Sequence, residues 1–377
     1  MAPYRHVYVH VPFCARRCSY CDFAIAVRRD VPVDAFVDAI GREIDVRGLR
    51  TQVQELHSLY LGGGTPSLLG PIGVARLMDV LQRAMPIGAN AEVTLEANPE
   101  DISDAAIRAW RSAGVTRLSI GVQSFSDPVL QWMHRIHDAE SARRAVHTAR
   151  NAGLTAVSLD LIFAVPDALQ RDWSSDLDAV LALTPDHVSL YGLTVEPHTP
   201  IGRWRQRGEV VESSEDRYAE QFLLAHERLT SAGYEHYEVS NFARPGCRAV
   251  HNSAYWTGAP YLGLGPSAHG FDGRERRWNA SAYAAWHRAV SAGDDPVEGR
   301  ELLTDANREA ERVYLGLRTR DGMRLTVTEA AAVTRWVEAG WLEWVGKASE
   351  RVARCTAQGW LRLDHLAADL TAVPSHS

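Results

Sequence analysis

The first half of the chain alternates between short apolar segments and segments whose apolar residues repeat at helical spacing. Strands are predicted at residues 7–11, 58–61, 93–95, 117–122, 157–163 and 187–193. Helices are predicted between them at residues 33–49, 72–85, 105–113, 139–152 and 172–183. Strands separated by helices of this length are typical of parallel βαβ units. A closed eight-fold barrel is an alternative, but six units within about 230 residues favour an α/β fold with a partial barrel, (β/α)6, open on one side.

The length of 377 residues exceeds one ordinary hydrophobic core and predicts more than one domain. We divide the chain into a barrel, a connecting segment and a C-terminal, mainly helical domain, at residues 1–235, 236–300 and 301–377. In the last of these, helices are predicted at residues 310–317 and 327–339, and residues 351–363 resemble the wing of a winged helix. Cys355 is distant in sequence from the other thiols and is predicted to be a buried apolar residue.

Charge and hydropathy exclude two classes of partner. A winged helix often binds DNA, but the net charge of -7 and the near balance of charges within 301–377 predict no binding to nucleic acid. No apolar run of about 18 residues is present, so no transmembrane segment is expected. The first six residues lack the layout of a secretory signal, and we therefore expect a cytoplasmic protein.

Three cysteines follow the first predicted strand in the pattern C-x3-C-x2-C, as Cys14, Cys18 and Cys21. A four-iron cluster takes one thiolate on each iron when fully ligated, so three cysteines leave one iron open for a ligand. A zinc site made by the three cysteines and His10 is the alternative. A disulfide is not favoured, because three clustered thiols leave one over. The neighbouring arginines at positions 16 and 17 favour thiolates and so metal binding of either kind.

Glycine or polar residues also lie at the ends of the next strands. Gly62-Gly63-Gly64-Thr65-Pro66 follows the second strand, Glu96 the third and Gln123 the fourth, and Asp160 lies on the fifth. Each alone fits a tight turn, a cap or a solvated side chain. The carboxyl ends of parallel strands meet at one edge of a sheet, so together these residues predict one site.

The chain resembles the oxygen-independent coproporphyrinogen oxidase branch of the radical S-adenosylmethionine (SAM) superfamily over essentially its whole length. The matching stretches are residues 8–14, 62–67, 95–99, 121–125, 160–163 and 187–191. The resemblance implies a [4Fe-4S] cluster on Cys14, Cys18 and Cys21, and reductive cleavage of SAM to a 5′-deoxyadenosyl radical as the available chemistry. It also implies that eight residues contact SAM, namely Tyr8, Gly63, Gly64, Thr65, Glu96, Gln123, Arg135 and Asp160. No catalytic residue is assigned.

Two stretches depart from the pattern of this branch. Phe163-Ala164-Val165-Pro166-Asp167 stands where F-G-L-P-G is usual, and His134 stands before Arg135 where glycine is usual.

Two features place the chain nearer to one subfamily of this branch. The coproporphyrinogen dehydrogenases have a fourth cysteine two residues after the third, and here that position is Phe23. The haem chaperones (HemW-like) have phenylalanine there and carry H-N-x-x-Y-W, which is present at residues 251–256. The resemblance to the chaperones implies haem and haem-accepting apoproteins as partners, with an electron donor such as flavodoxin or ferredoxin. The alternatives are a coproporphyrinogen III dehydrogenase, acting by radical oxidative decarboxylation, and a zinc-stabilised binding module without redox chemistry. A homodimer is left open.

The segment around the H-N-x-x-Y-W motif contains two candidate haem ligands. Cys247 and His251 lie four residues apart, and a thiol or an imidazole can each be an axial ligand of haem iron. Aromatic residues at 255, 256 and 261 could supply flat apolar surface, and Arg244 or Arg248 could pair with propionates. The alternative is that His251 and the aromatic residues only close the open edge of the barrel.

Overall fold

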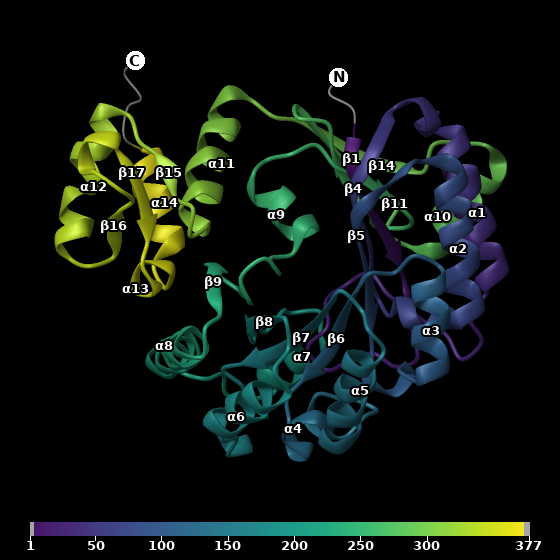
Figure 1. Cartoon of the computed structure of the whole chain (residues 1–377), viewed down its shortest axis with the longest axis horizontal. Coiled ribbons are helices and arrows are strands. Elements are labelled where there is room, and N and C mark those ends of the chain that lie inside the picture. Colours follow the sequence, from purple (N-terminus) through teal and green to yellow (C-terminus); the bar gives the residue numbers. More distant parts are fainter. Residues whose placement is uncertain (1–3, 373–377) are drawn as a thin grey trace.

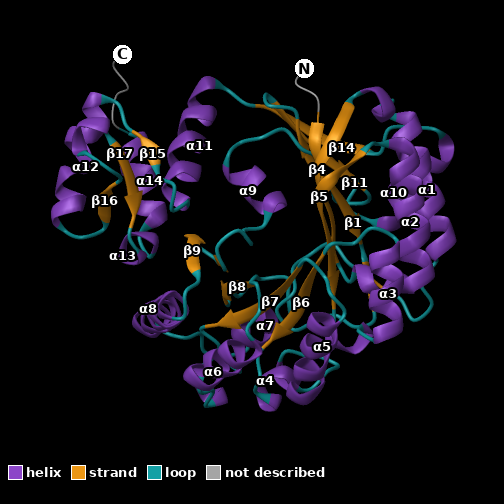
Figure 2. Ribbon diagram, in the orientation of Figure 1, coloured by secondary structure: helices purple, strands orange, loops and turns teal. Residues whose placement is uncertain are grey.

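The computed structural model describes residues 4–372, and it is built around one curved sheet of nine strands (Figures 1 and 2). Six parallel strands form its centre in chain order: β1 (Tyr4–Val11), β4 (Val53–Gly63), β5 (Ile87–Ala97), β6 (Arg117–Gln123), β7 (Ala156–Phe163) and β8 (His187–Gly192). The predicted partial (β/α)6 barrel is therefore confirmed, and each predicted strand lies within one of these six or matches it to within one residue.

Three short strands extend this sheet at its two edges. β11 (Leu262–Leu264) runs parallel to β1, whereas β10 (Asn241–Ala243) pairs antiparallel with β8 and β9 (Glu235–Glu238) with β10. All three lie at or after residue 235, where the barrel was predicted to end. The sheet thus continues into the segment that we predicted as a connector, because strands this short carry little periodicity.

Helices cover the convex face of the sheet (Figure 2). They are α1 (Val33–Val46), α2 (Gly70–Ala84), α3 (Asp104–Ser112), α5 (Ala139–Asn151), α6 (Trp173–Leu183) and α8 (Glu215–Ser231). The short helices α4 (Asp127–Trp132) and α7 (Pro200–Gln206) instead pack against the cysteine loop, where the backbone N–H of Ile201 donates to the carbonyl of Ser19. Several begin at a side-chain cap, as where Ser103 accepts from the backbone N–H of Ala106 and Asp138 from that of Ser141. Short 3-10 helices lie at Leu49–Thr51, Pro66–Leu69, Pro99–Asp101 and Asp167–Leu169.

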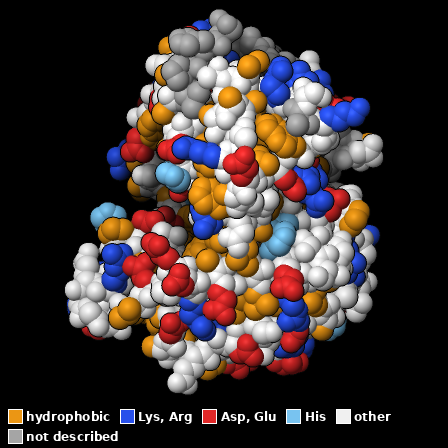
Figure 3. All heavy atoms as spheres, turned by 90° about the vertical axis from the view of Figure 1, so that its left-hand side faces the viewer, with side chains coloured by type: hydrophobic (Ala, Val, Ile, Leu, Met, Phe, Trp, Pro, Cys, Tyr) orange, Lys and Arg blue, Asp and Glu red, His pale blue; other side chains and the backbone are white. Residues whose placement is uncertain are grey.

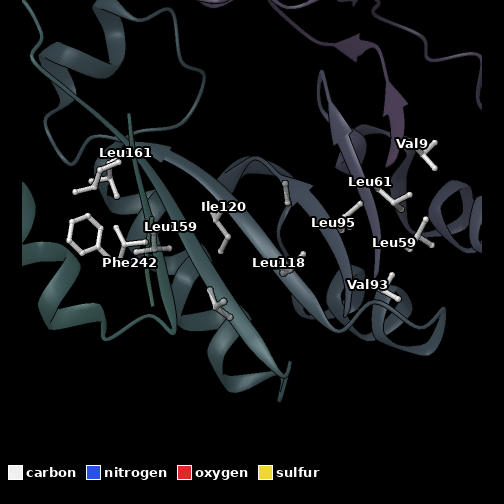
Figure 4. Close-up of a cluster of buried hydrophobic side chains, with 14 of the residues drawn as sticks. Val9, Leu59, Leu61, Val93, Leu95, Leu118, Ile120, Leu159, Leu161 and Phe242 are labelled. Atoms are coloured by element: carbon white, nitrogen blue, oxygen red, sulfur yellow. The ribbon is translucent and has the colours of Figure 1, made fainter. Parts of the chain in front are cut away.

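The two faces of the sheet differ because successive side chains of a strand point to opposite sides. Apolar residues such as Val9, Leu61 and Leu95 point toward the helices and form the core (Figure 4). The alternate positions carry polar side chains, among them Glu96 and Asp160. The concave side of the sheet is therefore polar and suits a ligand.

A short helix, α9 (Val250–Trp256), lies on this concave side (Figure 1). Both carboxylate oxygens of Glu92, in the middle of β5, accept hydrogen bonds of 3.0 Å from the first two backbone N–H groups of α9. This contact fixes the start of the helix against the sheet, and α9 carries the H-N-x-x-Y-W motif into the interior of the barrel.

The segment after α9 packs against the outside of the barrel. A three-stranded sheet contains β12 (His269–Phe271), β13 (Glu275–Asn279) and β14 (Val297–Leu302), and α10 (Tyr283–Ala292) packs on α1. The fully buried Glu43 of α1 accepts hydrogen bonds from Trp286, Asn279 and the backbone of Gly265. The cysteine loop has a small sheet of its own, β2 (Phe13–Cys14) and β3 (Ala26–Val27).

The C-terminal domain combines helices with a small antiparallel sheet, as the winged-helix prediction requires. Its elements are α11 (Asp305–Arg318), β15 (Met323–Arg324), α12 (Val327–Glu338), β16 (Leu342–Trp344), a 3-10 helix (Ala348–Glu350), β17 (Val352–Cys355), α13 (Ala357–Trp360) and α14 (Leu363–Thr371). The predicted wing at 351–363 is wrong in extent. Only β17 is a strand, and Thr356 then caps α13 by accepting from the N–H of Gly359. Cys355 is buried, as predicted.

Acidic and basic side chains are interspersed on the face of the molecule that carries this domain (Figure 3). Among the helices within residues 4–372, none is long and apolar enough to span a membrane.

Candidate functional site

A cavity of about 500 Å³ opens where the parallel strands end. Its wall includes all three predicted cluster ligands and seven of the eight predicted SAM contacts, which are Gly63, Gly64, Thr65, Glu96, Gln123, Arg135 and Asp160. Residues that are distant in sequence thus meet around one volume, as the strand-end argument predicts. This size lies within the usual range for small-molecule sites.

The cysteine loop is held in place by the segment before α5. The backbone N–H of Ser19 donates to the carbonyl of Met133 at 3.1 Å, and the guanidinium of Arg135 lies 3.5 Å from the sulfur of Cys18. Burial raises the pKa of Cys21 to about 11, although Arg17 acts in the opposite direction. Arg17 thus favours the thiolate of Cys21, as expected from its charge, but desolvation outweighs this effect on the pKa. Metal binding then has to displace the thiol proton.

The donor set fits a cluster better than a single zinc ion. Within residues 4–372, no three Cys, His, Asp or Glu side chains lie close enough together to hold one ion. His10 is also engaged, with Nδ1 3.1 Å from the Tyr8 hydroxyl and Nε2 3.0 Å from the carbonyl of Ala24. The Cys3His zinc site is therefore not supported. Three thiols that face one roomy cavity suit a larger group with several metal atoms, as a four-iron cluster is.

The three glycines after β4 allow very close packing. Gly63 has φ of +113°, and a Cβ atom built on it would lie 2.6 Å from the ring of His10. A Cβ on Gly64 would lie 2.7 Å from the carbonyl oxygen of Phe13, which precedes the first cysteine. Glycine is thus required here by the protein's own packing, in addition to any approach to a ligand.

Two carboxyl groups face the cavity from neighbouring parts of the barrel. Glu96 accepts from the Tyr60 hydroxyl at 2.8 Å and from the backbone N–H of Gly63 at 3.0 Å. Asp160 accepts from the Ser119 hydroxyl at 2.9 and 3.0 Å. Burial raises the pKa of Glu96 to about 7 and that of Asp160 to about 6, and the charge of Asp160 adds to the shift of Glu96. A cation bound beside these carboxyl groups would lower both pKa values and so favour their ionised forms.

Gln123 depends on a buried ion pair that sequence reasoning missed. Its backbone is left-handed, with φ of +65°. The two residues after it are held by Asp176, which accepts from the hydroxyl of Ser124 at 2.7 Å and the N–H of Phe125 at 3.0 Å. Asp176 is in turn paired with the buried Arg171. In the sequence, Asp176 is one polar residue within a helical pattern and carries no signal of its role. Its role is visible only in the structure, where it is 3% exposed, which is rare for a residue with a carboxylate.

Asn98 is a second residue that sequence reasoning passed over. Its side-chain oxygen accepts from Arg135 at 2.6 Å, and the same guanidinium donates to the carbonyl of Gly121 at 2.9 Å. Asn98 thereby fixes the direction of Arg135 at the cavity wall.

The two departures from the branch pattern share one backbone property. His134 and Ala164 have φ of +58° and +56°, in the left-handed region that favours glycine. The chain therefore keeps the backbone for which the branch uses glycine, and it bears the strain of a side chain at both positions.

Three predicted residues lie outside the cavity wall. Tyr8 stacks on Tyr60, with ring centroids 6.0 Å apart, behind the lining residues. His251 is 1% exposed, and its two ring nitrogens lie 2.8 Å from the hydroxyls of Ser58 and Tyr255. Cys247 lies in the loop before α9. The structure thus does not bring the two candidate haem ligands to the cavity, and His251 has no nitrogen free for a metal.

Comparisons with known proteins agree on the family. Residues 8–179 match the model of the radical SAM superfamily. The chain is 38% identical to heme chaperone HemW of Mycobacterium tuberculosis over 328 residues, which cover 86% of this chain and 84% of the relative. It is 36% identical to heme chaperone HemW of Escherichia coli, with 86% of this chain and 90% of the relative covered.

Among solved structures, coproporphyrinogen III oxidase (HemN) from Escherichia coli superposes with a TM-score of 0.81 and 23% sequence identity, over 98% of this chain and 90% of that chain. This similarity shows a shared fold from the barrel to the C-terminal domain. The extent and level of identity to the chaperones establish the family itself: the chain belongs to the HemW family within the radical SAM superfamily.

Proposed function

We propose that this protein is a haem chaperone, which binds haem and delivers it to haem-accepting apoproteins. The observation that carries the proposal is Phe23, which is 61% exposed and lines the cavity beside the cysteines. An exposed aromatic side chain at that place offers apolar contact to a flat ligand and no thiolate to a cluster. The relatives named as heme chaperones support the same assignment.

Membership of the radical SAM superfamily implies a [4Fe-4S] cluster and SAM, which when bound supply reductive cleavage of a carbon–sulfur bond. We assign the cluster to Cys14, Cys18 and Cys21. We assign SAM to the cavity wall, where the carboxylates of Glu96 and Asp160 suit a cationic ligand and Arg135 suits a carboxylate. Tyr8 acts from behind the wall by supporting Tyr60.

The remaining partners follow from this chemistry. A reducible cluster needs an electron donor, and we propose flavodoxin or ferredoxin. All five cysteines are free thiols, which supports the reducing cytoplasm as the compartment. We retain the division into barrel, connecting segment and C-terminal domain, with the edge strands of the sheet supplied by the connector.

The test compares two activities of anaerobically reconstituted protein. One sample receives haem in a titration followed by absorption, and the other receives coproporphyrinogen III, SAM and reductant. We expect saturable haem binding and no protoporphyrinogen. Conversion of the porphyrinogen without haem binding would assign the protein to the dehydrogenases instead.

The cluster assignment is tested with Cys18→Ala and the matched variant Cys247→Ala, whose thiol lies outside the cavity. Cys18→Ala should abolish the broad absorption at about 400 nm and the bound iron, and Cys247→Ala should retain both. Bound zinc in place of iron in the parent protein would contradict the assignment.

A further inference from the structure

His134 presents an unengaged imidazole at the cavity. Its side chain lines the cavity wall, and its ring makes no hydrogen bond to any residue within 4–372. The ring meets Trp204 edge-on, with centroids 5.4 Å apart and an interplanar angle of 76°. Its backbone has φ of +58°, where glycine would be less strained. The chain thus holds a free imidazole in a defined place at a cost in stability.

Four residues of the cavity wall have exposed or partly exposed side chains, and we call them the cavity mouth: Arg16, Phe23, His134 and Ile136. Phe23 and Ile136 are 61% and 53% exposed, although large apolar side chains are usually covered. Arg16 is exposed and lines the same cavity. Because both apolar side chains line the same cavity, they offer apolar surface to a ligand that enters it.

The mouth is attached directly to the cysteine loop. The residues on either side of His134 make the two contacts that hold that loop, from Met133 to Ser19 and from Arg135 to Cys18. A ligand at His134 therefore lies at the entrance next to the cysteines, and the barrel interior stays available for SAM.

We propose that His134 is an axial ligand of haem iron at the cavity mouth. Phe23 and Ile136 supply apolar contact for the macrocycle, and Arg16 pairs with a propionate. This inference rests on the proposed function and specifies its binding site. It places the ligand on a different residue from the two candidates of the connecting segment, because His251 has both nitrogens engaged and Cys247 lies off the cavity.

The test is a haem titration of the cluster-loaded full chain, followed by difference absorption and electron paramagnetic resonance. His134→Gly removes the imidazole and accommodates the left-handed backbone, so it should fold at least as well as the parent. We expect about tenfold weaker haem binding or more, with a shifted Soret band and unchanged iron from the cluster. Added imidazole should restore the parent spectrum in His134→Gly, which a purely structural role would not allow. His147→Ala, at an exposed position on α5, is the matched control and should bind as the parent does.

The outcomes separate the two levels of the proposal. A parent protein that binds no haem would overturn the proposed function together with this site. A parent that binds haem, with an unaltered spectrum in His134→Gly, would overturn His134 alone. Loss of the spectrum without rescue by imidazole would also overturn direct ligation.

Discussion

The ring of His251 lies 2.8 Å from the hydroxyl of Ser58, although 193 residues separate them in the chain. Ser58 lies on β4 inside the barrel, and the same hydroxyl lies 2.8 Å from His6 on β1. The other nitrogen of His251 meets Tyr255 one turn further along α9. This buried chain of polar groups ties the H-N-x-x-Y-W motif to the first two strands and makes His251 a structural residue of the barrel.

Replacement of His251 by alanine should therefore affect stability more than haem binding. Loss of two buried hydrogen bonds and of the ring should lower the free energy of unfolding by about 2 kcal/mol, measured by urea denaturation. Tyr255→Phe, which removes one hydroxyl, should cost about 1 kcal/mol. A changed Soret band at unchanged stability would instead make His251 a haem ligand.

The pKa of Glu96, raised to about 7 by burial, predicts pH-dependent binding of SAM. SAM is a cation at its sulfonium, so it favours the ionised carboxylate, which is lost as the pH falls below 7. Affinity should fall about tenfold between pH 8 and pH 6, measured by calorimetry. Glu96→Gln should bind SAM more weakly and with a flatter pH profile. Asp160→Asn is the matched comparison. It removes a carboxyl group whose pKa is raised to about 6, so the SAM affinity of this variant should depend less on pH below pH 6. An affinity independent of pH in the parent would contradict the assignment.

The same shift has the opposite sign for the stability of the ligand-free protein. The folded pKa of Glu96 exceeds the unfolded value of 4.5, so folding favours its protonated form. This contribution to stability is present below pH 4.5 and is lost as the pH rises through 7. The free energy of unfolding of the parent should therefore decrease as the pH rises from 4.5 to 7, and Glu96→Gln should not show this decrease.

Asp176 is expected to be the most sensitive of the positioning residues. Asp176→Asn leaves the buried Arg171 unpaired and should cost about 3 kcal/mol of stability. It also releases the backbone after Gln123, so SAM binding should weaken in protein that remains folded. The exposed pair of Glu140 and Arg144 is the matched control, and Glu140→Gln should change stability by less than about 0.5 kcal/mol. Equal effects in the two variants would show that the pair at Asp176 does not hold the loop.

Thr184 ends α6 in the left-handed region, with φ of +48°, which is costly for a β-branched residue. Thr184→Gly should raise the free energy of unfolding by about 1 kcal/mol. Thr148→Gly, inside α5, should instead lower it by about 0.3 kcal/mol, because glycine disfavours the helix more than threonine does. Thermal unfolding of both variants checks the prediction, and destabilisation by Thr184→Gly would refute it.

The sequence by itself determined the parts of this protein that depend on local periodicity and on strand order. Alternating and helical apolar patterns predicted the six strands and seven of the helices, because each pattern records which face of one element is buried. Parallel strands place their carboxyl ends together, so the cysteine loop, Gly63, Glu96, Gln123 and Asp160 could be assigned to one site before any coordinates were known.

Only the tertiary structure decided how segments far apart in the chain meet. The entry of α9 into the barrel, the engagement of both nitrogens of His251 and the support of Gln123 by Asp176 each depend on contacts that no local pattern encodes. The same holds for His134, which the sequence marked only as a departure from glycine. Its backbone angle, its unengaged ring and its place on the cavity wall that Phe23 also lines appear only once the chain is folded, because they are properties of the surroundings and not of the residue.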